Sequence, residues 1–206
     1  MKKWTLVALG LLCFAPISFA NNWGLGLRAG AAQNDPRDMK DAYNDYFAPR
    51  ERTWNPAVVG LEVLHEWDLN SESNKLGIKI GADVYGQNKI DLGPGMVKAT
   101  ETTYAIPLTV YYKNDNGERN LSWFAGVGFT WIRSEIKMDV WGFGRDKYSE
   151  SKIFPHITVG TEYRFNSVVA LGFDLKYNID AKVTQDADIL SDRSGIGGAI
   201  TARFYF

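Results

Sequence analysis

The sequence predicts an all-β fold, an eight-stranded antiparallel up-and-down transmembrane β-barrel. Three observations predict it: eight segments in which apolar and polar residues alternate, glycines on the polar side of those segments, and connections that alternate between long and short. Alternation with a period of two is the pattern of a strand with one apolar face. Each segment has 9 to 13 residues, and a tilted strand needs about 9 to 11 to cross the hydrocarbon core of a bilayer.

Four of the segments lie in the first part of the chain, at residues 23–31, 57–67, 76–84 and 104–112. Their apolar sides are mainly aliphatic with aromatic residues near the ends, namely Trp23, Leu25, Leu27; Val59, Leu61, Val63, Trp67; Leu76, Ile78, Ile80, Val84; and Tyr104, Ile106, Leu108, Val110, Tyr112. Pro107 lacks the N–H that a ladder hydrogen bond needs, so we expect a bulge there.

The other four segments lie at residues 121–131, 153–165, 169–177 and 196–206. Their apolar sides follow the same pattern, with Trp123, Val127, Phe129, Trp131; Ile153, Ile157, Val159, Tyr163, Phe165; Val169, Leu171, Phe173, Leu175, Tyr177; and Ile196, Ile200, Phe204, Phe206. None of the residues on the apolar side of the eight segments is Asp, Glu, Lys or Arg, although 23% of the chain is charged. Such uniformly uncharged sides fit contact with lipid.

Alternation alone does not say which side faces inward, because a soluble lipocalin-like barrel shows the same period with its apolar side inside. The glycines favour the membrane arrangement. Many of them, including Gly26, Gly77, Gly126, Gly128 and Gly160, fall on the polar side, where a narrow lumen needs small residues. Aromatic residues gather near segment ends, as in the girdles of membrane barrels, and comprise Trp23, Trp67, Tyr104, Tyr112, Trp123, Trp131, Tyr163 and Tyr177.

The connections separate into two kinds. Residues 68–75, 113–120 and 166–168 are short, whereas the other four connections have 18 residues or more. Outer-membrane barrels have short periplasmic turns and long external loops. The sequence therefore predicts that both termini lie in the periplasm.

The first 20 residues predict an export signal. Lys2 and Lys3 precede an apolar stretch at residues 6–14, and Ser18-Phe19-Ala20 offers a cleavage site with small residues before residue 21. The alternative, a buried helix, is disfavoured by Pro16. We expect residues 21–206 to form one barrel domain that retains no cysteine, because Cys13 leaves with the signal.

Glycine and aromatic spacing carries a resemblance to a known family. The relevant stretches are Ala125-Gly126-Val127-Gly128-Phe129, Val159-Gly160-Thr161-Glu162-Tyr163-Arg164-Phe165, Leu171-Gly172-Phe173-Asp174-Leu175-Lys176-Tyr177 and the closing Arg203-Phe204-Tyr205-Phe206. They resemble the outer-membrane-protein β-barrel domain family, and in particular the small OmpA/OmpX-like barrels, over essentially the whole mature chain. The resemblance implies a place in the outer membrane of a Gram-negative envelope, and it implies that Phe204 and Phe206 form the signal for the barrel-assembly machinery. The alternative is a last strand that merely ends in aromatic residues.

The polar side of the segments carries both signs of charge in equal number, namely Arg28, Lys79, Arg164, Lys176 and Arg203 against Glu62, Glu66, Asp83, Glu162 and Asp174. An eight-stranded barrel is just wide enough for its own side chains. We therefore expect these groups to pair and plug the lumen, with Glu66 and Glu162 pairing with Arg203 or Arg164. An open pore is the alternative.

Catalytic and metal-binding signals are weak. His156, Thr158 and Glu162 share one strand side, which gives an imidazole, a hydroxyl and a carboxylate, but lipid A deacylases among small barrels use serine where Thr158 stands. Asp180, Asp186, Asp188 and Asp192 lack the ligand order of a calcium loop. We expect no enzyme, cofactor or metal. A formal net charge of −1 without a basic block gives no reason to expect nucleic acid.

Two external loops carry candidate interaction residues. In the first, Asp35-Pro36 begins a short amphipathic helix that includes Tyr43, Tyr46 and Phe47; a collapsed loop is the alternative. In the third, the alternation around Ile136, Met138 and Val140 predicts a hairpin that projects beyond the membrane, with Trp141 and Phe143 at its tip. These aromatic residues would bind a partner or lipid, or pack against the other loop.

The sequence thus predicts a monomeric barrel whose loops act in surface interaction, adhesion or envelope support. Its expected partners are outer-membrane lipid and lipopolysaccharide, the assembly machinery, and an extracellular protein or other surface ligand. The alternatives are a porin-like passive channel for small apolar solutes and, less favoured, a lipid-modifying enzyme.

Overall fold

The fold is known from a computed structural model, which describes residues 22–33, 51–53, 56–69, 73–92, 97–116, 120–142, 144–185 and 188–206. The expected export signal, the first-loop helix with Tyr43, Tyr46 and Phe47, and the tip residue Phe143 lie outside these ranges. Throughout the described residues the regular structure is β-strand. In them, no helix has the length and apolar character needed to cross a membrane.

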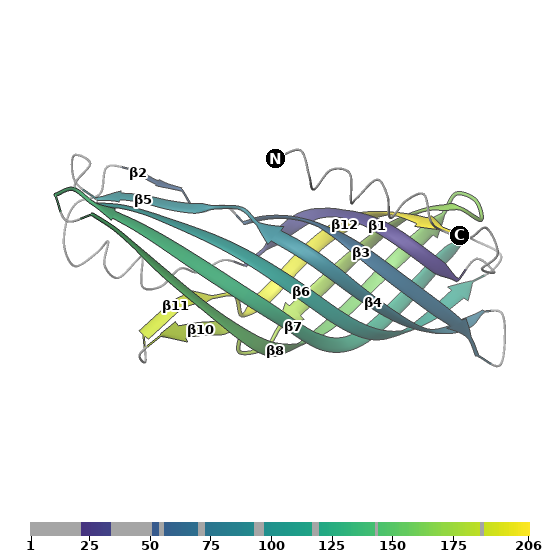
Figure 1. The fold of residues 1–206 in the computed structure, drawn as a ribbon. Helices are drawn as coiled ribbons and strands as arrows, with labels where there is room; N and C mark the ends of the chain where they lie inside the picture. Colours follow the sequence, from purple (N-terminus) through teal and green to yellow (C-terminus); the bar gives the residue numbers. More distant parts are fainter. Residues whose placement is uncertain are drawn as a thin grey trace.

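Eight strands close into an antiparallel barrel (Figure 1). They are β1 (Trp23–Ala32), β3 (Ala57–Asp68), β4 (Asn74–Tyr85), β6 (Val97–Asn116), β7 (Leu121–Val140), β8 (Gly144–Arg164), β9 (Val169–Asn178) and β12 (Gly195–Tyr205). Around the barrel they run β6-β4-β3-β1-β12-β9-β8-β7, and β7 pairs again with β6. Each strand except β12 is followed around the wall by the next barrel strand of the chain, and β12 closes on β1. The predicted up-and-down fold and its eight strands are confirmed.

Three strands are much longer than predicted. β6, β7 and β8 have 20, 20 and 21 residues, and together they extend well past the rest of the barrel (Figure 1). At the other end, the predicted turns at 68–75 and 113–120 are too long, because β4 already begins at Asn74 and β6 ends only at Asn116. Beyond the predicted segments the outward positions are mostly polar, but strand pairing continues.

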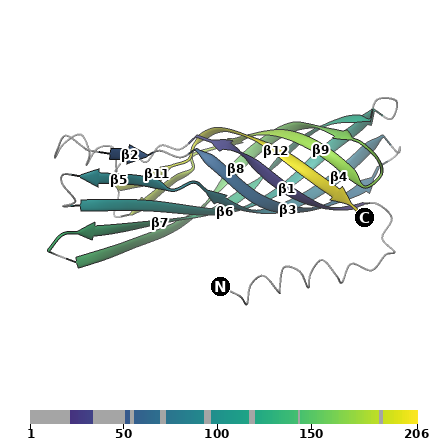
Figure 2. The same cartoon turned by 90° about the horizontal axis from the view of Figure 1, so that it is seen from above.

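Four short strands are added at the extended end. β5 (Asn88–Leu92) pairs with β6, and β2 (Glu51–Thr53) pairs with β5 (Figure 2). We call these two strands, together with the parts of β6, β7 and β8 that continue past the rest of the barrel, the extended sheet. β10 (Lys182–Gln185) and β11 (Asp188–Asp192) form a separate hairpin between β9 and β12. The chain end at Phe206 lies at the opposite end of the barrel (Figures 1 and 2), where its N–H bonds to Trp23 O at 2.9 Å.

The outward side of the barrel wall is apolar, and the inward side is buried and polar. Val127 is 63% exposed and Phe129 is 59% exposed, while Thr130 on the same strand is completely buried. This inverts the arrangement of a water-soluble protein, whose apolar side chains are mostly inside. An exposed apolar band on all eight strands is the surface that lipid would cover.

The bulge expected at Pro107 is absent. The β4–β6 pairing keeps one register on both sides of it, from Ile80↔Leu108 to Asp83↔Ala105. No residue is inserted; the β4–β6 ladder simply lacks pairs opposite Pro107 and its neighbour. The missing N–H is thus accommodated by a local gap in the ladder and not by a bulge.

The hairpin predicted in the third loop is confirmed. β7 and β8 pair without a register shift from Leu121↔Tyr163 to Val140↔Gly144. Gly142 and Gly144 have φ values of 84° and 102° at the turn, a region that residues with a Cβ rarely adopt. These glycines let the two strands reverse within a few residues of Trp141.

Candidate functional sites: the lumen and the extended sheet

The inward side chains fill the barrel from end to end, and facing glycines make room for the larger ones. A Cβ on Gly26 would lie 2.6 Å from Cγ of Glu62, and one on Gly77 or Gly160 would collide with the ring of Tyr111 or Phe124. Small and large residues therefore alternate across neighbouring strands, as close packing requires.

A tight ionic cluster fills the end of the barrel near Phe206. Lys113 Nζ lies 2.6 Å from Glu162 and 3.1 Å from Glu66. Arg164 lies 3.2 Å from each of the same two carboxylates. Arg203 Nη1 donates to Glu162 at 2.8 Å, and its Nε donates to Glu62 at 2.6 Å.

Two buried tyrosines complete this cluster. Tyr205 donates its hydroxyl hydrogen to Glu162 at 2.7 Å, and Tyr111 donates to Glu66 at 3.0 Å. Arg164 also lies 4.1 Å from the centre of the Tyr205 ring, within cation–π distance. Glu162 and Glu66 thus each receive several donors, which is the condition under which buried charge is tolerated. Glu62 accepts from Arg203 through one oxygen, and its Oε2 has no hydrogen-bond partner.

The middle of the lumen holds a looser cluster. Arg28 lies between two carboxylates, 3.5 Å from Asp83 and 3.7 Å from Asp174. Each carboxylate also has a lysine nearby: Lys176 lies 3.8 Å from Asp83, and Lys79 lies 3.6 Å from Asp174. Both lysine Nζ atoms have no hydrogen-bond partner. The cavity between these groups measures only about 10 Å³, which is roughly the space of one water molecule.

His156 lies deeper toward the extended end and is held by two hydroxyls. Its Nε2 is 2.9 Å from Thr109 Oγ1, and its Nδ1 is 2.9 Å from Thr130 Oγ1. Thr158 instead donates to the carbonyl of Leu175, and Glu162 belongs to the ionic cluster. The three residues that share a strand side therefore do not form a nucleophile, base and acid relay.

An apolar layer lies above His156 at the mouth of the barrel. Phe154, Ile132 and Tyr85 pack there with Ala181 and Val183, which come from the start of the β10–β11 hairpin. All five are at most 2% exposed. The connection between β9 and β12, residues 179–194, is the last connection of the chain, and it thus contributes side chains that close the mouth.

A second buried ion pair covers this apolar layer. Arg193 lies 3.2 Å from Glu101 and donates to Thr103 at 2.9 Å. Asn88 donates to Glu101 at 2.6 Å. Arg193 comes from the last connection, whereas Glu101 and Asn88 come from the paired strands β6 and β5. The pair therefore ties the last connection to the extended sheet.

The structure brings all ten predicted lumen residues into the interior, where nine are at most 9% exposed; the Arg164 side chain is 21% exposed. Sequence reasoning missed Lys113, Lys75, Glu101 and Arg193. Lys113 and Lys75 lie in residues predicted to form turns, and Lys113 continues the inward phase of Tyr111 by one step. Extending that strand by one residue would have found it.

The predicted aromatic girdle lies on the outward side. Trp23, Trp67, Tyr104, Tyr112, Trp123, Tyr163 and Tyr177 are 37% to 50% exposed, and Trp131 is partly exposed. Tyr112 and Trp123 contact each other with ring centres 5.7 Å apart. Phe204 and Phe206 are likewise outward, at 43% and 44% exposed.

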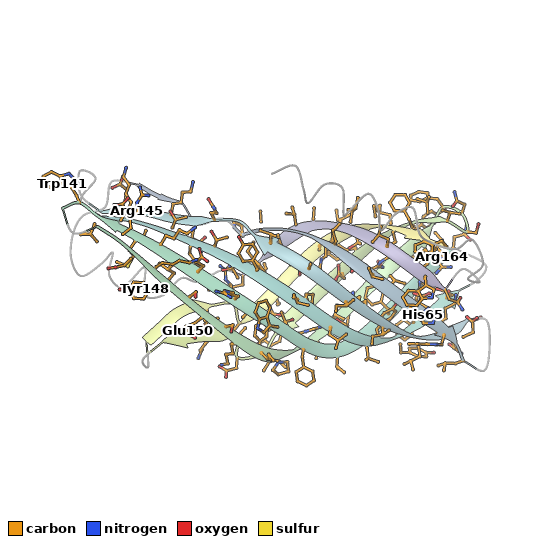
Figure 3. All side chains as sticks on the ribbon, in the orientation of Figure 1. His65, Trp141, Arg145, Tyr148, Glu150 and Arg164 are labelled. Carbon is orange, nitrogen blue, oxygen red and sulfur yellow. The ribbon has the colours of Figure 1, made fainter. Side chains whose placement is uncertain are left out.

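The extended sheet has exposed polar side chains on the outward face. Lys137 and Lys147 lie 3.1 Å and 2.8 Å from Glu135, and Arg145 lies 2.8 Å from Asp139. Hydrogen bonds from Lys147 and then Lys137 hold the pKa of Glu135 below its ordinary value of 4.5. Trp141 is 80% exposed at the tip; in Figure 3 it lies with Arg145 at the opposite end of the molecule from Arg164.

Among the described residues, no group of three or more His, Cys, Asp or Glu side chains is arranged to hold a metal ion.

Residues 5–204 match the family described as the outer membrane protein beta-barrel domain, and the chain belongs to that family. It is therefore an outer-membrane protein. No curated protein sequence matches the chain significantly.

Several solved structures share its fold. Neisserial surface protein A is 14% identical with a TM-score of 0.56, over 89% of this chain and 97% of that one. OprG from Pseudomonas aeruginosa is 12% identical with a TM-score of 0.53, over 91% and 96%. Ail, the attachment invasion locus protein of Yersinia pestis, in complex with the heparin analogue sucrose octasulfate, is 11% identical with a TM-score of 0.53, over 89% and 96%. These identities show the fold alone.

Proposed function

We propose that this protein is a monomeric outer-membrane barrel with a plugged lumen, which acts through its extended sheet and loops in surface interaction or adhesion. In this arrangement residues 1–20 are removed on export, both termini lie in the periplasm, and the β7–β8 hairpin lies outside the cell. Phe204 and Phe206 serve as the signal for the assembly machinery.

The observation that carries the proposal is the contrast between the two ends of the molecule. The lumen is filled by ion pairs, hydroxyls and an apolar layer, and its central cavity measures about 10 Å³. Yet three strands continue far beyond the lipid-facing band (Figure 1). A passive channel does not need strands that extend past the lipid-facing band, and a filled lumen would hinder the passage of solutes.

The similar structures support a surface role in a general way. One is a surface protein by its name, and another is an attachment protein seen with a heparin analogue. By this analogy, the extended sheet would present a binding surface to a ligand outside the cell.

The proposal is tested by shortening the hairpin. Arg133 and Ser151 are paired, so a two-residue Asn-Gly turn can replace residues 134–150 and still close the strands. Ligands are first recovered by pull-down with cells that carry the wild-type protein on their surface. Intact cells that carry the wild-type or the shortened form are then assayed for binding to these ligands. We expect the shortened form to reach the membrane and to lose binding, whereas Lys152→Gln retains it.

Two outcomes would contradict the proposal. One is unchanged ligand binding by the shortened form. The other is a steady conductance of the wild-type protein in planar bilayers, which would favour the second candidate, passage of small solutes through the lumen.

A further inference from the structure

The outward face of the extended sheet carries an excess of positive charge. Six basic side chains lie on it, which we call the basic strip: Lys89, Lys98, Arg133, Lys137, Arg145 and Lys147. Three acids share the same face of these four strands, namely Asp91, Glu135 and Asp139. On β5, β6, β7 and β8 this face therefore has a net charge of +3, although the whole chain is close to neutral.

The strip forms in ordered cross-strand rows. Lys98, Asp139 and Arg145 occupy one row, and Thr100, Lys137 and Lys147 occupy the next. The register is unbroken from these rows down into the barrel wall. The charged groups are therefore held on a paired sheet and not on a loose loop, which lowers the entropy lost on binding.

The position of the strip identifies its environment. Ile106, Trp131 and Ile153 form one cross-strand row of the exposed apolar band, here called the belt. Arg133 lies on the same face one row beyond it. Lys137 and Lys147 lie two rows further. At about 3.4 Å per residue and a tilt near 40°, these rows stand roughly 5 Å and 15 Å above the belt. The strip thus faces sideways, at the height of lipid head groups.

The opposite face of the same strands has a different character. Its inward positions hold Ile132, Ser134 and Ile136, all at most 5% exposed, together with the Glu101–Arg193 pair. By contrast, the side chains of Lys137, Arg145 and Lys147 are 66%, 84% and 56% exposed. The positive charge is thus accessible on the side that borders the membrane.

We propose that the basic strip binds the phosphate groups of the glycolipid in the outer leaflet, that is, of lipopolysaccharide surrounding the barrel. Lysine and arginine bind phosphate through charge-assisted hydrogen bonds, and basic clusters next to a membrane span recognise anionic head groups. Neighbouring hydroxyls of Thr100, Thr102 and Ser149 supply further donors on this face. The inference rests on the proposed outward orientation of the hairpin and adds a lipid partner to it.

The test uses the purified full-length barrel in detergent micelles, titrated with deep-rough lipopolysaccharide by microscale thermophoresis. The variant Lys137→Gln/Lys147→Gln removes two charges from the strip. The control Lys152→Gln/Lys182→Gln removes two charges nearby: Lys152 is on the other face of β8, where it pairs with Asp180. We expect the dissociation constant to rise about tenfold in the variant and less than twofold in the control.

Two further arms identify the ligand. Lipopolysaccharide treated with phosphatase should bind as weakly as the double variant, and a soluble heparin fragment should bind more weakly than the glycolipid. Wild-type affinity in the double variant, or affinity that survives phosphate removal, would overturn the inference. Equal or tighter binding of heparin at the same lysines would also overturn it, in favour of a soluble polyanion.

The outward orientation is tested separately. Proteinase added to intact cells should cut near Trp141 if the hairpin is outside. Failure of that cleavage would contradict the proposed function, whereas loss of glycolipid binding in micelles concerns the strip alone.

Discussion

Glu162 is the carboxylate on which the interior cations converge. It accepts hydrogen bonds from Lys113, Arg203, Arg164 and Tyr205 at 2.6 to 3.2 Å. Loss of the Glu162 carboxylate would leave the buried cations Lys113, Arg203 and Arg164 with one negative charge fewer to balance them. The loss of one partner from a buried ion pair is much more costly than the loss of a surface pair.

We therefore expect Glu162→Gln to destabilise the barrel by about 3 to 5 kcal/mol. The measurement is urea-induced unfolding in lipid vesicles, monitored by tryptophan fluorescence. Glu135→Gln is the matched control, because it removes a carboxylate that also pairs with two cations but lies in the extended sheet; its cost should be below about 1 kcal/mol. Equal effects of the two substitutions would contradict a tightly paired lumen.

Glu135 should show a pH dependence of its own. Because hydrogen bonds from Lys147 and Lys137 lower its pKa below 4.5, its contribution to hairpin stability is present above that value and is lost as the pH falls through the folded pKa. An NMR titration of the Glu135 carboxyl carbon measures this directly. In Lys147→Gln the pKa should move back toward 4.5; an unchanged pKa would show that Lys147 is not its main partner.

At the level of strands, the barrel closes because glycine lets neighbouring strands and their side chains approach. A Cβ on Gly128 would collide with the carbonyl of Leu108 and would lie 2.9 Å from the ring of His156. Gly81 has more room, since its nearest neighbours would be at 3.1 Å and 3.2 Å.

Gly128→Ala should accordingly destabilise the protein by about 1 to 3 kcal/mol, as overpacking of a filled interior does. Gly81→Ala is the control on another inward position and should cost clearly less. Both are measured by the same unfolding assay in vesicles. If the two variants unfold alike, the interior at Gly128 is looser than the structure implies.

The sequence identified the eight membrane-crossing strands because lipid imposes a strict alternation on each of them. It identified less of β6, β7 and β8, because beyond Tyr104, Trp131 and Ile153 the outward face meets water and becomes polar. The apolar positions Ile132 and Ile136 then remain only on the inward face. The alternation around Ile136, Met138 and Val140 predicted the hairpin, but it did not show that the hairpin strands continue unbroken from the barrel wall.

The buried charges of the interior also fall into two groups, those that strand phase predicts and those that it does not. The charges of the lumen could be chosen from strand phase alone, as Arg203 and Glu162 show. Lys113 was missed because its strand was ended one residue too early. Arg193 and Glu101 were missed because they meet only after the last connection of the chain folds over the barrel mouth, which is a tertiary event without a local signal.

For the molecule as a whole, the account depends on one inversion: the apolar side of every strand faces acyl chains, and the ionic side fills the closed interior. The outward Val127 and Val159 are 63% and 51% exposed, whereas the inward Thr130 and Thr158 are at most 3% exposed. The same strands supply both kinds of position, so each strand contains its own internal control.

The most direct test is spin labelling of single-cysteine variants at these four positions in lipid bilayers, with accessibility measured by power saturation. Labels at Val127→Cys and Val159→Cys should relax strongly with oxygen, which dissolves in the bilayer, and weakly with a water-soluble nickel complex. Labels at Thr130→Cys and Thr158→Cys should be poorly accessible to both reagents. High nickel accessibility at Val127 and Val159, or oxygen accessibility that is equal on the two sides, would contradict the account.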